Sequence, residues 1–204
     1  MKLVVVTPPT QTALTLNEAK SYLRLTHDLD DAALADFLPL VDRVCEQYQG
    51  RALLAQTVEQ YLDDWPTDDV VRLYGPVREL TSIEVLDDDS EWQEVPAEDY
   101  DADLIARQPT VRPLGSWPTP ADRVNAIKIT LDVGYETPAD VPVTTRQGLK
   151  QLVSLPQDWR HLAGMGAAGL PPEVRRWLDF ERVLWLPSIA DVGLDAETLA
   201  RGCP

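Results

Sequence analysis

The amino-acid sequence predicts an α+β fold, in which N-terminal and C-terminal helices form a helical bundle and an antiparallel β insertion separates them. Apolar residues recur every three or four positions up to residue 53 and again after residue 140, which is the spacing of a buried helix face. From about residue 54 to 134 the period changes to two, which is typical of half-buried strands. The chain has 204 residues, of which 44% are hydrophobic, so it holds enough apolar material for one globular core or two small ones.

The N-terminal helical part, residues 1–53, begins with an extended segment and is expected to contain two helices. Thr15 or Asn17 can cap a first, short helix. Its apolar stripe consists of Leu16, Ala19, Tyr22 and Leu23. The buried face of the second helix consists of Leu34, Phe37, Leu38, Val41, Val44, Cys45 and Tyr48. Gly50 is its expected stop, and Pro39 removes one backbone donor, so we expect a kink there or first turns that are separate from the rest.

The β insertion, residues 54–134, contains three runs that are rich in β-branched residues and indicate strands. These runs are residues 70–74, 80–86 and 126–133. Turn residues separate them at 75–76, 87–90 and 115–118. We therefore expect an antiparallel sheet in this part of the chain.

The C-terminal helical part, residues 141–186, is expected to complete the bundle. Its first helix carries Arg146, Leu149, Leu152 and Val153. Pro156 and a run of small residues from 163 to 169 predict a break and a flexible joint, and Pro171-Pro172 can begin a last helix. That helix presents Val174, Trp177, Leu178, Val183 and Leu184. Residues 187–204 form a tail with few apolar anchors, which we expect to become ordered on contact with a partner.

Charge is distributed unevenly along the chain. The formal net charge is -16, and residues 63–103 hold fifteen acidic residues against Arg72 and Arg78, a balance of -13. Residues 141–186 have a balance of +2. Because the net negative charge repels phosphate backbones and anionic lipid, a general nucleic-acid binder is not expected.

The sequence has no signal for membrane insertion or export. No stretch approaches the ~18 consecutive apolar residues of a membrane span, and residues 1–6 are too short for the apolar core of a signal peptide. Two cysteines, Cys45 and Cys203, are too few for a disulfide framework, which fits a reduced compartment. We expect a soluble protein that is intracellular when made.

No motif in the sequence predicts catalysis, a cofactor or a metal ion. The acidic run 87–91 lacks the Gly at the sixth position and the spaced Glu of a calcium loop, so a solvated hairpin turn is favoured. Ser154, Asp158 and His161 suggest a nucleophile, an orienter and a base, but a single helix supplies no oxyanion site. Cys45 lies on the apolar stripe and is expected to be a buried structural thiol. The chain is therefore not expected to be an enzyme.

Arginines and tryptophans near the C terminus are the best candidates for contacts with other proteins. Interface cores are enriched in aromatic residues and arginine. A short helical region can bury only some of Trp159, Trp177 and Trp185, although the alternative, that all three fill the intramolecular core, is equally favoured. The candidate interface residues are Arg146, Lys150, Trp159, Arg160, Arg175, Arg176, Trp177 and Trp185.

The order of several short motifs is informative. Residues 8–9 (PP), 16–24 (LNEAKSYLR) and 50–57 (GRALLAQT) come first. They are followed by 62–66 (LDDWP), 76–77 (PV), 99–100 (DY), 115–118 (GSWP), 125–126 (NA), 134–135 (GY) and 140–142 (DVP). Over residues 8–155, these motifs together resemble the head-tail connector (adaptor) proteins of long-tailed bacteriophages and gene transfer agents.

The resemblance implies a structural virion protein of the head-tail neck, assembled in the cytoplasm of a bacterial host. In that family a helical bundle carries a β insertion, and about twelve copies form a ring between the portal and the next neck protein, the stopper. DNA passes through the central channel without specific binding. The implied partners are thus further copies of the chain, the portal protein and the stopper. Family members continue the third helix, whereas Pro156 and residues 163–169 predict a break here.

Two interpretations from other classes remain. An acidic DNA-mimic inhibitor would present the segment 63–103 to a basic partner protein, with strong salt dependence. A hydrolase is less favoured because the grouping of Ser154, Asp158 and His161 lacks a second element to supply an oxyanion site. Only the connector interpretation predicts that a ring forms when the portal is present.

Overall fold

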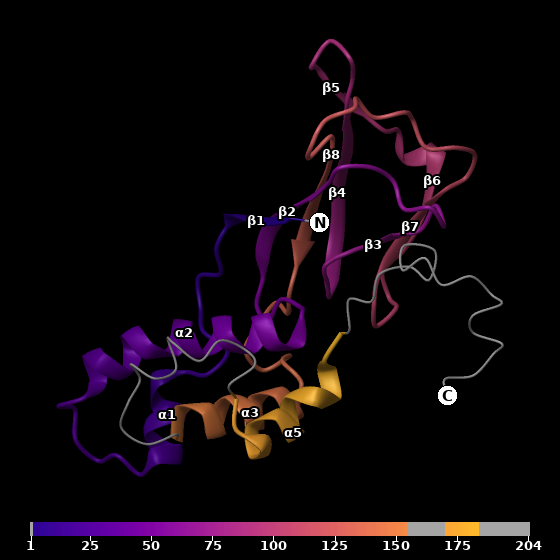
Figure 1. Cartoon of the computed structure of the whole chain (residues 1–204). Helices are drawn as coiled ribbons and strands as arrows, with labels where there is room; N and C mark the ends of the chain where they lie inside the picture. Colours follow the sequence, from indigo (N-terminus) through magenta and orange to yellow (C-terminus); the bar gives the residue numbers. More distant parts are fainter. Residues whose placement is uncertain (1, 155–169, 184–204) are drawn as a thin grey trace, which may run out of the picture. The chain divides into compact units, whose positions relative to one another are not determined.

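The computed structural model describes residues 2–154 and 170–183, and these residues form the mixed α+β fold that the sequence predicts (Figure 1). The chain divides into two compact units. One contains residues 2–6 and 57–132 and is built from strands; the other contains residues 7–56 and the described part of 133–184 and is built mainly from helices. None of the described helices has the length and apolar character needed to cross a membrane.

Helix α1 begins, and helix α2 ends, where the sequence predicts. Helix α1 (Leu16–Leu23) is capped by Thr15, whose side chain accepts a hydrogen bond from the Glu18 amide while Glu18 bonds back to the Thr15 backbone. Helix α2 (Asp31–Gln49) ends at Gly50, which has a φ of 67°. Tyr22, expected on the apolar stripe of α1, is instead 39% exposed.

Helix α2 is continuous through Pro39, so of the two expected outcomes, a kink or separate first turns, the second is excluded. Pro39 lies on the exposed side of the helix, and its neighbours Phe37, Leu38 and Val41 are buried. Burial of three large side chains stabilises the helix by several kcal/mol, which exceeds the ~3 kcal/mol cost of a proline in a helix interior.

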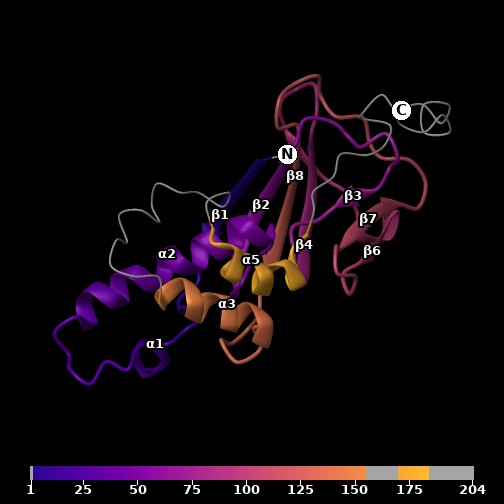
Figure 2. The same cartoon turned by 60° about the horizontal axis from the view of Figure 1, so that its bottom comes forward.

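The C-terminal helices complete the core of the helical unit. Helix α3 (Val143–Ser154) packs on α1, α2 and α5 (Pro172–Leu178), which begins at the predicted prolines and continues into a 3-10 turn, η3 (Asp179–Glu181). Figures 1 and 2 both show α3 and α5 side by side. Leu149 and Leu152 of α3 and Leu178 of α5 are fully buried in one hydrophobic cluster with residues of α1 and α2.

The strands form two sheets. The five-stranded sheet has the order β1 (Lys2–Thr7), β2 (Gln56–Leu62), β8 (Ile127–Val133), β4 (Val77–Leu86), β5 (Trp92–Glu94). The three-stranded sheet has the order β3 (Val71–Arg72), β7 (Thr110–Pro113), β6 (Tyr100–Asp103), and a 3-10 turn, η1 (Ala97–Asp99), precedes β6. Strands β4 and β5 pair in antiparallel fashion, as does β7 with both of its neighbours.

The three strand-like runs in the sequence correspond to β3, β4 and β8, and β8 shows the expected alternation of burial. The strands β2, β5, β6 and β7 were not identified from the sequence, and residues 2–7 were expected only to be extended. Gln60 in β2 is fully buried. Its burial is tolerated because the side-chain amide donates to the Arg72 carbonyl (2.8 Å) and accepts from the Tyr74 amide (2.9 Å).

Candidate functional site

The candidate interface residues within the described chain lie on α3 and α5, and the packing of these helices decides which side chains reach the surface. A Cβ atom on Gly148 of α3 would lie 2.5 Å from Leu178 Cδ2 and 3.4 Å from Trp177 Cβ. Glycine therefore lets α5 approach α3 closely. Val174 and Leu178 point into the core, which leaves the arginines between them on the outer side of α5.

A buried amide joins the helices under this surface. Gln49, the last residue of α2, is fully buried, and its Nε2 donates to Thr145 Oγ1 and to the Leu178 carbonyl, each at 3.0 Å. The Gln49 carbonyl accepts a hydrogen bond from the Val183 amide (2.8 Å). Because buried polar groups are costly when left unpaired, these bonds specify where α5 and the turn after it lie relative to α2 and α3.

Arg146 forms an ion pair inside the helical unit. Its guanidinium bonds to Glu18, the same carboxylate that completes the N-cap of α1. Hydrogen bonding to the Thr15 backbone lowers the pKa of Glu18, and Arg146 adds to this effect. Arg146 thus ties α3 to the start of α1, and its side chain is only 25% exposed.

Lys150 and Trp177 are half-buried. Trp177 packs against Phe180 with ring centroids 6.5 Å apart. In the amide orientation that satisfies both of its groups, Gln151 accepts from Trp177 Nε1 (3.1 Å) and donates to the Glu173 carbonyl (3.0 Å). Trp177 is therefore partly committed to contacts within its own chain.

Arg175 and Arg176 are the exposed members of the predicted set. They lie beside an open hollow whose other lining residues are Tyr48, Pro172, Glu173, Asp179 and Arg182. Neither arginine forms an ion pair within the described residues. The hollow is rigid on its other side, because Tyr48 Oη donates to Asp179 Oδ1 (2.6 Å) and the Arg182 guanidinium lies 4.6 Å from the Tyr48 ring centroid. Burial and the bond to Asp179 raise the pKa of Tyr48.

Three predicted interface residues, Trp159, Arg160 and Trp185, lie outside the described residues, as does the tail 187–204. The same holds for Asp158 and His161 of the triad alternative. Among the residues that the structure does describe, no group of three or more His, Cys, Asp or Glu could hold a metal ion.

The acidic run after β4 forms the predicted hairpin turn between β4 and β5. The Asp87 carboxylate accepts hydrogen bonds from the Glu91 amide and from Gln93 Nε2, both at 2.9 Å. The bond from the Glu91 amide, and to a smaller extent that from Gln93, lowers the pKa of Asp87.

Cys45 is fully buried as predicted, and burial raises the pKa of its thiol well above the usual range.

Arg51 is a structural cation that the sequence did not single out. It is 6% exposed, its Nη1 bonds to Glu181 Oε2 at 2.9 Å, and its Nη2 donates to Tyr135 Oη at 3.2 Å. The only sequence signal is its place in the 50–57 motif, directly after the helix stop. Burial raises the pKa of Tyr135, while the Arg51 charge acts in the opposite direction. Arg51, which lies between α2 and β2, therefore links Glu181 in the turn after α5 to Tyr135, which follows β8.

Comparison with known proteins identifies the fold. No protein-family model matches the chain, and neither does any curated protein. Among solved structures, a chain in the neck of an empty GTA particle, computed with C6 symmetry, is 24% identical with a TM-score of 0.73 and covers 92% of this chain and 100% of its own.

Two further structures agree. A chain in the virion of a native gene transfer agent (GTA) particle is 24% identical with a TM-score of 0.71, over 91% of this chain and 97% of that one. A chain in the neck of a native GTA particle, computed with C12 symmetry, is also 24% identical with a TM-score of 0.69, over 92% and 100%. This chain therefore has the fold of these particle components across nearly its whole length.

Proposed function

We propose that the chain is a structural protein of a virion neck, where its copies form a ring. The observation that carries this proposal is the fold match, which spans nearly the whole of both chains. The similar chains belong to GTA necks computed with C6 and C12 symmetry, and such symmetry arises when identical copies surround an axis. The motif order over residues 8–155 supports the same assignment.

The finer form of the proposal is a head-tail connector that lies between the portal and the stopper, with DNA passing through the channel of a ring of about twelve copies. The shared core of α1, α2, α3 and α5 is the helical bundle of that family, and the strand unit is its β insertion. Assembly takes place in the cytoplasm of the bacterial host. The chain needs no cofactor and catalyses no reaction in this role.

The charge distribution suits a ring. Copies in a ring meet through heterologous contacts, in which one patch of a subunit faces a different patch of the next. The chain has an acidic segment, 63–103, and a mildly basic one, 141–186. In the ring the predicted set on 141–186, with the tail 187–204, contacts the portal or the neighbouring copy. Of that set, Arg175 and Arg176 are the exposed arginines without an internal ion pair among the described residues.

The test is the mass of the purified protein, alone and after mixing with portal-bearing particles. The wild-type protein is expected to join the particles as a ring. Deletion of residues 141–204 is a poor variant, because Leu149, Leu152 and Leu178 belong to the core of the helical unit. The better variant is Arg176→Glu, which we expect to weaken capture at least about tenfold, since reversing a charge at a contact costs more than ~1.4 kcal/mol.

Arg78→Glu is the matched control, because Arg78 is also exposed but lies on β4 within the acidic segment. It should leave capture unchanged. A wild-type protein that never changes mass in the presence of the portal would overturn the proposal. If that protein instead bound a basic protein as a monomer or dimer, with strong salt dependence, the DNA-mimic alternative would replace it.

A further inference from the structure

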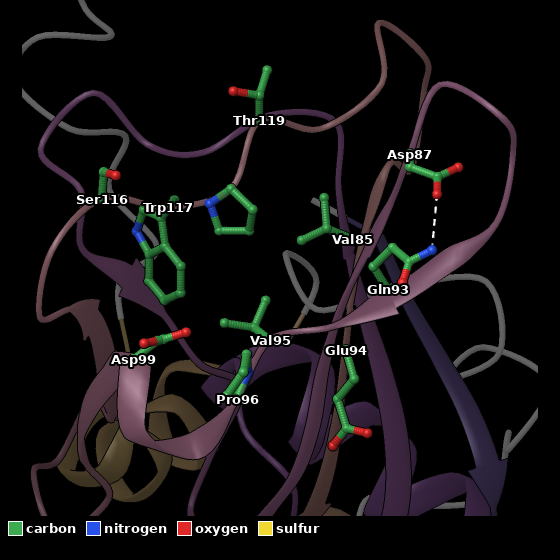
Figure 3. Close-up of a pocket in the computed structure, with 11 residues that line it drawn as sticks. Val85, Asp87, Gln93, Glu94, Val95, Pro96, Asp99, Ser116, Trp117 and Thr119 are labelled. Atoms are coloured by element: carbon green, nitrogen blue, oxygen red, sulfur yellow. Dashed lines mark hydrogen bonds between the residues drawn. The ribbon is translucent and has the colours of Figure 1, made fainter.

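The strand unit contains an amphipathic cavity of about 370 Å³ beside the β4–β5 hairpin (Figure 3). The apolar part of its lining consists of Val85, Val95, Pro96, Trp117 and Pro118. The remaining lining residues are Asp87, Gln93, Glu94, Asp99, Ser116 and Thr119. Three of these are acidic and none is basic, so the cavity combines an apolar interior with a negative rim.

One wall of the cavity is rigid. The Trp117 indole stacks on Trp65, with ring centroids 4.1 Å apart and planes 8° from parallel. Its Nε1 donates to the Asp69 carbonyl (3.0 Å), and Trp65 Nε1 donates to the Pro118 carbonyl (2.8 Å). Because Trp117 is fixed on one side by these contacts, it presents a preorganised aromatic surface on the side that lines the cavity.

The acidic rim contains one carboxylate that is available to a partner. Asp87 is engaged by the Glu91 amide and by Gln93, and Glu94 points away from the cavity centre in Figure 3. The Asp99 side chain forms no hydrogen bond or ion pair within the described residues, although its backbone is held by bonds to Pro96 and Leu114. It therefore projects from a fixed turn, near the Trp117 wall (Figure 3).

An aromatic surface next to a carboxylate, above an apolar interior, suits an arginine side chain. The planar guanidinium stacks on aromatic rings and pairs with a carboxylate through two parallel hydrogen bonds, and its aliphatic stem gains from apolar burial. Lysine offers a compact and strongly hydrated charge, which matches this combination less well.

We propose that this cavity receives Arg175 or Arg176 from α5 of the neighbouring copy, and that this is the heterologous contact that closes the ring. The inference rests on the proposed function, because it names the contact between copies in that ring. The two arginines are exposed on the mildly basic segment and have no carboxylate partner among the described residues. Each copy carries both the cavity and the arginines, so every subunit can bind the next in the same way.

The experiment is a charge exchange between the two sides of this contact, read as the mass of rings formed by the full chain on portal-bearing particles. Asp99→Arg alone should reduce ring formation at least about tenfold, and so should Arg175→Asp or Arg176→Asp alone, according to which of the two arginines enters the cavity. The protein that carries both changes should recover to within about threefold of wild type, because the pair is restored with opposite polarity. The exposed neighbour Glu98, which does not line the cavity, provides the control variant Glu98→Arg, and it should assemble normally.

The outcomes separate this inference from the proposed function. Rings of normal mass from Asp99→Arg copies would overturn the inference and leave the neck assignment intact. If Asp99→Arg abolishes the rings and neither Arg176→Asp nor Arg175→Asp restores them, the inference is also overturned. If the wild-type protein forms no ring on the portal, the proposed function itself is overturned. Thermal unfolding of each variant is the control for folding, and we expect these exposed substitutions to leave the chain folded.

Discussion

At Gly134 the backbone leaves no room for a side chain. Its φ is 90°, and a Cβ there would overlap the carbonyl oxygen of Leu54. The close approach allows Tyr135 to bond the Leu53 carbonyl (3.0 Å) and the Ala55 amide to bond the Tyr135 carbonyl (2.9 Å). The backbone at Gly134 therefore lets residue 135 pair with residues 53–55, which are distant from it in the sequence of the helical unit.

Gly134→Ala is expected to destabilise the protein by on the order of 3 kcal/mol, because the clash is with backbone and the φ is unfavourable for an L-residue. Urea unfolding measures this loss. Gly115→Ala is the control, since a Cβ there meets nothing within 4 Å, and its stability should stay within ~0.5 kcal/mol of wild type. Equal stabilities of the two variants would contradict the role assigned to Gly134.

Asp42 is a carboxyl group whose ionisation opposes folding. It lies on α2 and accepts a hydrogen bond from the Ala13 amide (2.8 Å). Burial raises its pKa from 3.8 to about 7, the Ala13 bond acts in the opposite direction, and Glu46 raises it further. Burial also raises the pKa of Glu46. The folded state thus holds these protons more tightly than the unfolded chain does.

The stability from Asp42 is fully present below pH ~4 and is lost as the pH rises through about 7. Asp42→Asn keeps an acceptor for the Ala13 amide and removes the charge, so the decline in unfolding free energy between pH 5 and pH 8 should become shallower. Urea midpoints at the two pH values measure it. The exposed Asp36 on the same helix gives the control, Asp36→Asn. Parallel pH profiles for wild type and Asp42→Asn would show that Asp42 is not responsible.

At the scale of elements, the position of α5 depends on the close α3–α5 contact. Gly148 is in a helix interior, where alanine normally stabilises by ~1 kcal/mol. Here the added methyl group would meet the fully buried Leu178, and overpacking of this kind costs ~1–3 kcal/mol. We expect the overpacking to exceed the gain in helix propensity, since Leu178 is fully buried and packed interiors have few voids.

Gly148→Ala should therefore lower the unfolding free energy by up to about 2 kcal/mol, which is the overpacking cost less the gain in helix propensity. In a background of Leu178→Ala the same change should cost less or become stabilising, because the methyl group then fills the vacated space. A double-mutant cycle from denaturant unfolding gives the coupling. Additive effects would mean that the two residues do not compete for space, and that another contact sets the position of α5.

The sequence predicts helices better than strands for a physical reason. Helices α1 and α2 carry their limits locally, through the Thr15 cap, the Gly50 stop and an apolar stripe. Strands β5 and β6 have three and four residues, with acidic side chains that have low strand propensity, so only pairing with β4 and β7 defines them. The tolerance of α2 for Pro39 is likewise decided by burial of its neighbours.

At the scale of the whole molecule, the separation of charge along the sequence is retained in the fold. The acidic segment 63–103 lies within the strand unit, whereas Arg175 and Arg176 lie in the helical unit. A heterologous contact between two unlike patches generates a ring when its rotation closes. The proposed contact between Asp99 and Arg175 or Arg176 joins these two unlike units of neighbouring copies.

The sequence by itself determined the α+β class, the start of α1, the end of α2, the acidic hairpin turn and the buried Cys45, because each follows from local periodicity, capping or turn chemistry. It also pointed to Arg175 and Arg176, whose exposure on α5 follows from the helical period. Only the tertiary structure decided that Arg146 pairs with Glu18, that Arg51 is buried, and that Trp65 and Trp117 stack beside Asp99. The hydrogen bonds that fix these contacts join residues 53 to 130 positions apart in the chain, and no local pattern records which distant side chains folding brings together.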